Sequence, residues 1–217
     1  MDADDKLQKS FDNFKSICPN DDSKLMHLPN WLSNTSYRFV QEFKGKFPKG
    51  YYHYKRGTII RVNFGVNMGS EFSNTHFAIV LDKKDNSKKR TLTVLPLTSK
   101  QKIGRYSLGK EIFNQTIVLL NIQLDNIESR LEKLSKLSEE DRQKEVTSLM
   151  VDVASIKKVI NIYRRYNKNS FVRLSDITTI SKFRIQRINK FDPSGKIILS
   201  EQQMKDISNK LMKLYIK

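Results

Sequence analysis

The sequence predicts an α+β protein in which a small antiparallel sheet or barrel is accompanied by helices. Three β-rich runs with short connections lie at residues 59–64, 76–81 and 91–97, which is the pattern of a meander. Apolar residues recur every three or four positions before and after these runs, which indicates helices on both sides of the sheet in the sequence. With 217 residues, the chain is long enough for one sizeable domain with additions or for two small domains.

Two amphipathic helices are predicted ahead of the first strand, over residues 4–18 and 30–43. The first has apolar residues spaced by three and four positions, namely Leu7, Phe11, Phe14 and Ile17. Residues 44–50 contain Gly and Pro, which break the second helix. We therefore predict an N-terminal helical extension over residues 1–50.

The three predicted strands form the centre of the chain. In the first strand every second side chain shares one apolar face, namely those of Ile60, Val62 and Phe64. The connection over residues 65–74 is rich in Gly, Asn and Ser and is predicted to be a loop. The next connection, residues 82–90, is a charged turn, and residues 100–110 are predicted to be an exposed basic loop.

A helical hairpin is predicted after the strands. Residues 113–120 indicate either a fourth strand or the start of a helix, and apolar residues at spacings of three and four continue through residues 117–166. Ser138 precedes three acidic residues and suits an N-cap, so we place a break there. An antiparallel pair of helices brings the flanking segments together, whereas one continuous helix would hold them too far apart for one barrel.

The last part of the chain returns to the sheet and then forms a helix. Residues 170–172 and Leu174 resume a strand, and residues 192–195 have the composition of a turn. Ser200 and Gln203 fit a capping box, which predicts an amphipathic C-terminal helix.

The net charge of +17 is unevenly distributed. Residues 51–116 have 12 basic and 4 acidic side chains, and residues 170–217 have 10 and 4. Residues 1–50 have 8 and 7, and residues 117–169 have 10 and 8, so these segments are nearly balanced. Because the excess lies in the predicted sheet, we favour a nucleic-acid partner over a general solubility charge.

Composition also limits the class of protein. Cys18 is the single cysteine, which excludes an internal disulfide and suits a reducing compartment. No apolar run approaches the length of a membrane span, and the acidic N-terminus does not resemble a secretory signal. We therefore predict a cytoplasmic protein with no membrane partner. The three histidines are not spaced as zinc ligands, and no cofactor is predicted.

Several motifs accompany the predicted strands. Arg56-Gly57 opens the first strand, Gly69-Ser70-Glu71 lies in the first loop, and Pro96-Leu97-Thr98-Ser99 ends the third strand. A later block, residues 170–184, reads SFVRLSDITTISKFR. In their order and spacing these blocks resemble the MazF/PemK family of toxin endoribonucleases, and with their flanks they cover roughly half of the chain.

This resemblance implies a small SH3-like antiparallel β-barrel. Residues 51–120 and 169–217 would form the barrel, and residues 121–168 would be an inserted helical hairpin. The family's function implies a metal-independent endoribonuclease that cleaves single-stranded RNA to a cyclic phosphate, forms a homodimer and binds an antitoxin protein. The alternative is a non-catalytic nucleic-acid-binding protein on the same barrel, with the helical insert as a protein-interaction module.

The resemblance also implies two catalytic positions. The family uses an Arg at the start of the second strand and a Thr at the end of the third; here these positions are His76 and Thr98. Histidine exchanges a proton near neutral pH, but it does not replace a permanently charged guanidinium. Arg61 or a loop lysine is therefore expected to supply the cation, unless His76 is a strand residue without a catalytic role.

RNA contacts are implied at the first strand, in the first loop and at two later positions. These residues are Arg56, Arg61, Gly69, Ser70, Glu71, Phe72, Ser99 and Asp176. Phe72 has a ring that can stack on a base, and Ser70 and Glu71 can hydrogen-bond a base edge. The alternative for the loop is that it folds on its own hydrogen bonds.

Overall fold

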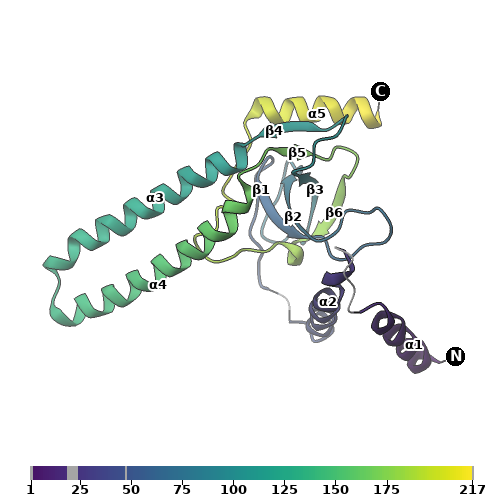
Figure 1. Ribbon diagram of the computed structural model, residues 1–217, viewed down its shortest axis with the longest axis horizontal. Helices are drawn as coiled ribbons and strands as arrows, with labels where there is room; N and C mark the ends of the chain where they lie inside the picture. Colours follow the sequence, from purple (N-terminus) through teal and green to yellow (C-terminus); the bar gives the residue numbers. More distant parts are fainter. Residues whose placement is uncertain (1, 19–23, 47, 217) are drawn as a thin grey trace. The chain divides into compact units, whose positions relative to one another are not determined.

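The computed structural model describes residues 2–18, 24–46 and 48–216, and it shows an α+β protein (Figure 1). The predicted α+β class is therefore confirmed. The chain divides into two compact units, and each is described by itself. The first unit consists of Met1–Tyr51 and Asn63–Thr75, and the second of Tyr52–Val62 and His76–Lys217.

The first unit contains the two helices predicted from the N-terminal sequence, α1 (Ala3–Ser16) and α2 (Leu28–Phe43). A capping box between Asp2 and Asp5 begins α1, and a short 3-10 turn precedes α2. Helix α1 has no buried residue, so its apolar side chains are exposed.

The second unit is built on an antiparallel sheet in the order β1-β2-β3-β5-β4, with β6 also paired to β3. The strands are β1 (Ile59–Asn63), β2 (Thr75–Val80), β3 (Thr91–Thr98), β4 (Tyr106–Gly109), β5 (Ser170–Val172) and β6 (Thr178–Ser181). Strands β1 to β3 confirm the predicted meander. Strand β4 corrects the prediction of a loop over residues 100–110, because Tyr106 and Ser107 pair with β5.

The described sheet does not close into the SH3-like barrel that was predicted. Strand β3 pairs with β6 through its first half and with β5 through its second half. The outer edge of β1 meets the late segment of the chain at two isolated bridges, Thr58 to Ile198 and Val62 to Ile185. Between them the Gly195 amide donates to the Ile59 carbonyl over 2.7 Å, and the Arg61 amide donates to the Ser194 hydroxyl over 2.9 Å. A turn around Pro193 runs between these bridges, and a proline has no N–H to donate to a ladder. The sheet therefore remains open at β1.

Both faces of the sheet are buried. Ile59, Phe77, Ile79, Leu95 and Leu97 point to one face and join the core formed with the helices. The alternate residues of the same strands are equally buried, namely Ile60, Val62, Ala78, Val80, Leu92 and Val94. Burial on two sides explains why these strands read as nearly continuous apolar runs.

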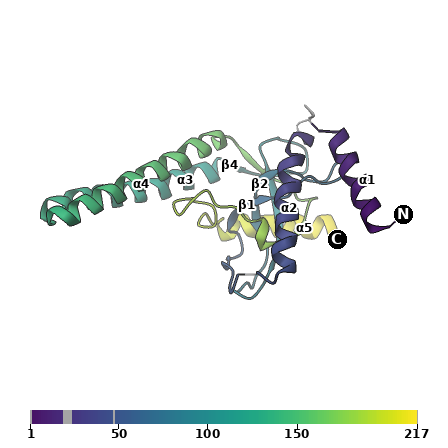
Figure 2. The ribbon, with the colours of Figure 1, turned by 90° about the horizontal axis from the view of Figure 1, so that it is seen from below.

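The long helices confirm the break expected at Ser138. Helix α3 (Glu111–Lys133) and helix α4 (Glu139–Tyr163) run side by side away from the sheet (Figures 1 and 2). The Ser138 hydroxyl accepts a hydrogen bond from the Asp141 amide. Residues 113–120 are helical, which resolves the alternatives left open for them. Helix α5 (Glu201–Tyr215) begins with the predicted capping box.

A buried ion pair joins three distant segments of the second unit. The Lys182 ammonium lies 2.7 Å from Asp85 Oδ1, and the two side chains are 2% and 0% exposed. Lys182 also donates to the carbonyls of Tyr52 and Asn86, and Asp85 accepts from the Tyr54 amide. No helix of the described residues is long and apolar enough to span a membrane.

Candidate active site

The register between β2 and β3 brings the two predicted catalytic residues together. Ala78 pairs with Pro96 and the ladder is antiparallel, so two residues further along His76 comes opposite Thr98. Residues opposite each other in a sheet point to the same face, with Cβ atoms about 5 Å apart. His76 and Thr98 therefore lie on one face at one end of the sheet.

Arg173 is a third polar residue at this place. Strand β5 pairs Phe171 with Thr98, and the Arg173 amide donates to the Pro96 carbonyl over 3.0 Å. By alternation, Arg173 shares the face of Pro96 and Thr98. Sequence reasoning did not select Arg173, although it is the charged residue within the apolar run of residues 171–174.

The electrostatics of His76 differ from those of the arginine that the family uses. Burial lowers the pKa of His76 below the usual 6.5, and the positive charge of Arg173 lowers this pKa further. His76 is therefore neutral at neutral pH and can accept a proton. Arg173 supplies the permanent positive charge that a neutral imidazole does not have.

Asp176, a predicted RNA contact, forms an ion pair with Arg173. Its carboxylate lies 2.5 Å from the Arg173 guanidinium and accepts a hydrogen bond from the Ser175 hydroxyl over 2.7 Å. Two charge-assisted contacts of this kind restrict where the guanidinium lies. Asp176 is therefore placed to orient Arg173.

Thr98 and Ser99 lie where β3 ends. The Thr98 hydroxyl oxygen accepts a hydrogen bond from the Lys100 amide over 3.2 Å. Its own proton can then be donated to another acceptor, because a hydroxyl both donates and accepts. Ser99 is exposed beside it.

Arg61 does not supply the cation beside His76. Its charge acts on Tyr163, whose ring centroid lies 5.7 Å from that of Phe77. Phe77 follows His76 in β2, so the two side chains point to opposite faces. The structure thus places Arg61 on the face of the sheet opposite His76. Arg173, and not Arg61, is the arginine on the same face as His76.

Arg56 lies at the other end of β2. Its guanidinium donates to the Leu81 carbonyl and, over 2.9 Å, to the Ser208 hydroxyl of α5. Leu81 is five residues from His76, which is roughly 16 Å along a strand. The structure therefore does not bring Arg56 to the candidate site.

The first loop belongs to the first unit and is held by its own hydrogen bonds. The Asn67 amide group donates to the Phe72 carbonyl over 2.7 Å, and the Glu71 amide donates to the Met68 carbonyl over 3.1 Å. The Phe72 ring stands edge-on to Phe64, with centroids 5.1 Å apart. Gly69 has a φ of +50° and Ser70 is exposed.

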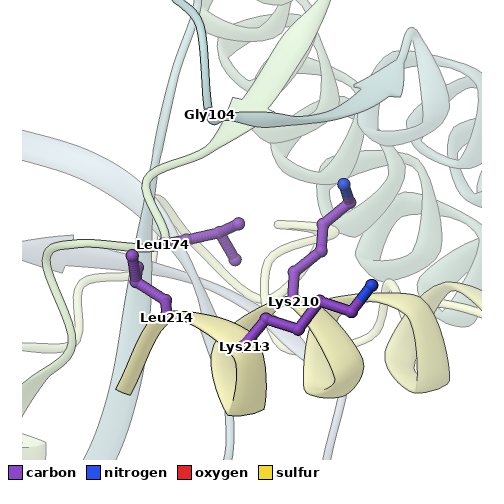
Figure 3. Close-up of a pocket in the computed structure, with 5 residues that line it drawn as sticks. All are labelled: Gly104, Leu174, Lys210, Lys213 and Leu214. Carbon is purple, nitrogen blue, oxygen red and sulfur yellow. The ribbon is translucent and has the colours of Figure 1, made fainter. Parts of the chain in front are cut away.

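A shallow pocket of about 210 Å³ lies against α5. Its lining residues are Gly104, Leu174, Lys210, Lys213 and Leu214. Figure 3 shows both lysine side chains extending from α5 to the same side, with the two leucines beside them.

The sheet thus brings a cation, a hydroxyl and a neutral imidazole to one face of a basic α+β domain. Among the described residues, no cluster of three or more His, Cys, Asp or Glu side chains could hold a metal ion.

Comparison with protein families gives a match over part of the chain. Residues 55–153 match the family described as PemK-like, MazF-like toxins of type II toxin-antitoxin systems. This segment of the chain is therefore similar to PemK-like toxins, and the resemblance predicted from the sequence is confirmed. The match spans slightly less than half of the 217 residues and ends within α4, before Arg173. No curated protein matches the chain.

At the level of the family, the match implies a toxin endoribonuclease and an antitoxin as its partner.

Proposed function

We propose that this protein is a toxin that cleaves single-stranded RNA without a metal ion, acts in the cytoplasm as a homodimer and is neutralised by an antitoxin protein. The observation that carries the proposal is the placement of His76, Thr98 and Arg173 on one face of the sheet. The family match supports the toxin class, and the positive charge of the chain supports RNA as the substrate.

Each group has a role in the proposed reaction. Neutral His76 accepts the proton of the 2′-hydroxyl, whose oxygen attacks the phosphorus. Arg173 and the Thr98 hydroxyl stabilise the charge that grows on the phosphate oxygens. The bond from phosphorus to the 5′-oxygen then breaks, that oxygen takes a proton from water, and the hydroxide formed takes the proton back from His76. The products are a 2′,3′-cyclic phosphate and a 5′-hydroxyl end.

The proposed RNA surface extends beyond these groups. In the second unit it includes Ser99 beside the site and the lysines of the pocket on α5. In the first unit, we propose that Gly69, Ser70, Glu71 and Phe72 of the first loop are separate RNA contacts. In this proposal residues 51–120 and 169–217 form the catalytic domain, residues 121–168 the helical insert and residues 1–50 the extension. We also propose Arg56 and Arg61 as RNA contacts. They would bind parts of the RNA that lie away from His76, at the other end of β2 and on the other face of the sheet.

The proposal is tested by incubating the purified protein with a long single-stranded RNA in EDTA and identifying the new ends. We expect cyclic phosphate and 5′-hydroxyl ends from the native protein and almost none from Arg173→Ala. Arg165→Ala, which removes an exposed arginine from the turn after α4, is the matched control and should cleave normally. Equal cleavage by native protein and Arg173→Ala would contradict the proposed site.

A second candidate function is binding of RNA without cleavage. The observation that favours it is the ion pair between Arg173 and Asp176, because a paired guanidinium has less charge to offer a phosphate. In that case the protein retains RNA with a steep dependence on salt and produces no new ends under any condition of the same assay.

A further inference from the structure

One face of the helical hairpin carries a stripe of exposed apolar side chains. The stripe consists of six residues that are 38–69% exposed: Ile117, Leu124, Leu131, Val146, Met150 and Val153. Single exposed apolar residues are common on protein surfaces, whereas a continuous row along two adjacent helices marks an interaction surface.

The two sides of the hairpin are distinguished by an ion network. Arg130 of α3 donates to Glu145 and to Asp152 of α4, each over 2.7 Å. These contacts fix the register of the helices and mark one face. Ile127 and Leu149 are buried between the helices, 6% and 3% exposed.

The stripe lies on the face opposite this network. On α3, Arg130 and Leu131 follow Ile127 by three and four residues, so they flank it on opposite sides. On α4, Glu145 and Val146 flank Leu149 in the same way. Because Arg130 and Glu145 meet on one face, Leu131 and Val146 must share the other.

The spacing of the stripe is that of an unfilled bundle core. On α3 the exposed residues Ile117, Leu124 and Leu131 recur every seven positions. The buried residues Leu120 and Ile127 also lie seven positions apart, and each follows an exposed one by three residues. Helices in a four-helix bundle use two apolar positions per heptad. The hairpin fills one of these positions internally and leaves the second exposed, so it has the pattern of half a bundle.

Charge favours a second copy of the same hairpin as the other half. Residues 111–163 have seven basic and nine acidic side chains, so the hairpin is nearly neutral although the whole chain is strongly positive. Two hairpins can therefore pack together with little charge repulsion. Glu128 and Lys157 each follow a buried residue and border the stripe on α3 and α4 respectively. In a two-fold arrangement with α3 against the partner's α4, these opposite charges face each other twice.

We propose that the stripe is a self-association surface, through which two copies of the chain form an antiparallel four-helix bundle. The proposal does not depend on nuclease activity, and it concerns an interface separate from the one that the family resemblance implies for the sheet domain.

The first experiment compares two substitutions of the same residue type on the same helix. Val153 lies in the stripe, and Val151, which is 60% exposed, points away from it. Sedimentation velocity over a range of concentrations should show that Val153→Asp weakens the association through the hairpin on the order of 100-fold or more, so that only association through the sheet domain remains, since symmetry places the buried charge in the hairpin interface twice. Val151→Asp should associate like the native protein. Equal association of all three folded proteins would overturn the proposal.

A second experiment identifies the occupant of the stripe. In a Cys18→Ser background, a chain with Leu124→Cys is mixed with a chain with Val153→Cys under oxidising conditions. We expect a disulfide-linked pair of chains, and we expect none from the matched mixture of Val118→Cys and Val151→Cys, whose positions lie off the stripe. Absence of linked chains from the first mixture would show that another element, such as the chain's own N-terminal helices or an antitoxin, covers the stripe, and would overturn the proposal.

Discussion

Replacement of Arg173 tests the site through an equilibrium property that does not depend on catalysis. The positive charge of Arg173 is the second cause of the lowered pKa of His76, and burial is the first. In Arg173→Ala the pKa of His76 should therefore rise, but it should stay below 6.5 because burial remains. Arg173→Lys keeps the charge, so the pKa of His76 should remain close to its native value.

The cleavage rate should respond differently from the pKa. Removal of one preorganised donor to a developing oxyanion lowers the rate about 10²–10³-fold, so Arg173→Ala should lose at least that much. Arg173→Lys keeps a charge but loses the bidentate fork, and it should give an intermediate rate. Because cleavage needs neutral His76, activity of the native protein should rise with pH through a midpoint below 6.5.

The lowered pKa of His76 also predicts the sign of a change in stability. A folded-state pKa below the unfolded value means that protonation favours unfolding. Neutral His76 therefore adds to the free energy of unfolding. This added stability is fully present above about pH 6.5 and is lost as the pH falls through the lower folded-state pKa of His76.

The assay is an NMR titration of the imidazole protons, with His76→Gln used to assign its signal among the three histidines. Cleavage rates are measured over the same pH range for native protein, Arg173→Ala and Arg173→Lys. If the pKa of His76 is the same in Arg173→Ala as in the native protein, the two side chains do not interact and the site is wrong.

Two further predictions concern stability and RNA binding. Lys182→Met leaves Asp85 buried without its ion pair, so the free energy of unfolding in urea should fall by about 3–5 kcal/mol; a fall below 1 kcal/mol would show that the carboxylate is solvated or neutral. Lys210→Ala and Lys213→Ala should each reduce the slope of RNA affinity against salt by about one, measured by fluorescence anisotropy, whereas Lys205→Ala on the same helix should leave it unchanged; equal slopes in all three would remove the pocket from the RNA surface.

Local patterns of the sequence were sufficient for most of the fold. Alternation identified β1, and the break at Ser138 followed from an N-cap residue ahead of acidic side chains. Strand β4 was missed because its four residues lie in a basic segment and are fixed by pairing with β5, which is more than 60 residues away. Barrel closure was predicted from the family resemblance. Whether the sheet closes depends on how the turn around Pro193 packs against β1, and residues far apart in the sequence decide that packing.

The candidate site was predictable only in part, for a similar reason. His76 and Thr98 were predicted because their positions within two strands match a family pattern, and the register of β2 and β3 places them opposite each other. Arg173 was not found because its proximity to them depends on β5 pairing with the second half of β3. Arg61 was named with the loop lysines as a candidate cation, but alternation within β1 turns it to the other face.

The helical insert is structurally continuous with the candidate site. Helix α3 starts directly after β4, and the turn after α4 leads into β5, so the insert joins two strands that are hydrogen-bonded to each other. At its base, Tyr163 and Tyr166 pack their rings against Phe77, with centroids 5.7 and 4.7 Å apart. Phe77 follows His76, and β5 leads directly to Arg173. Any change in the hairpin that moves these tyrosines therefore acts on both strands that carry the proposed base and cation.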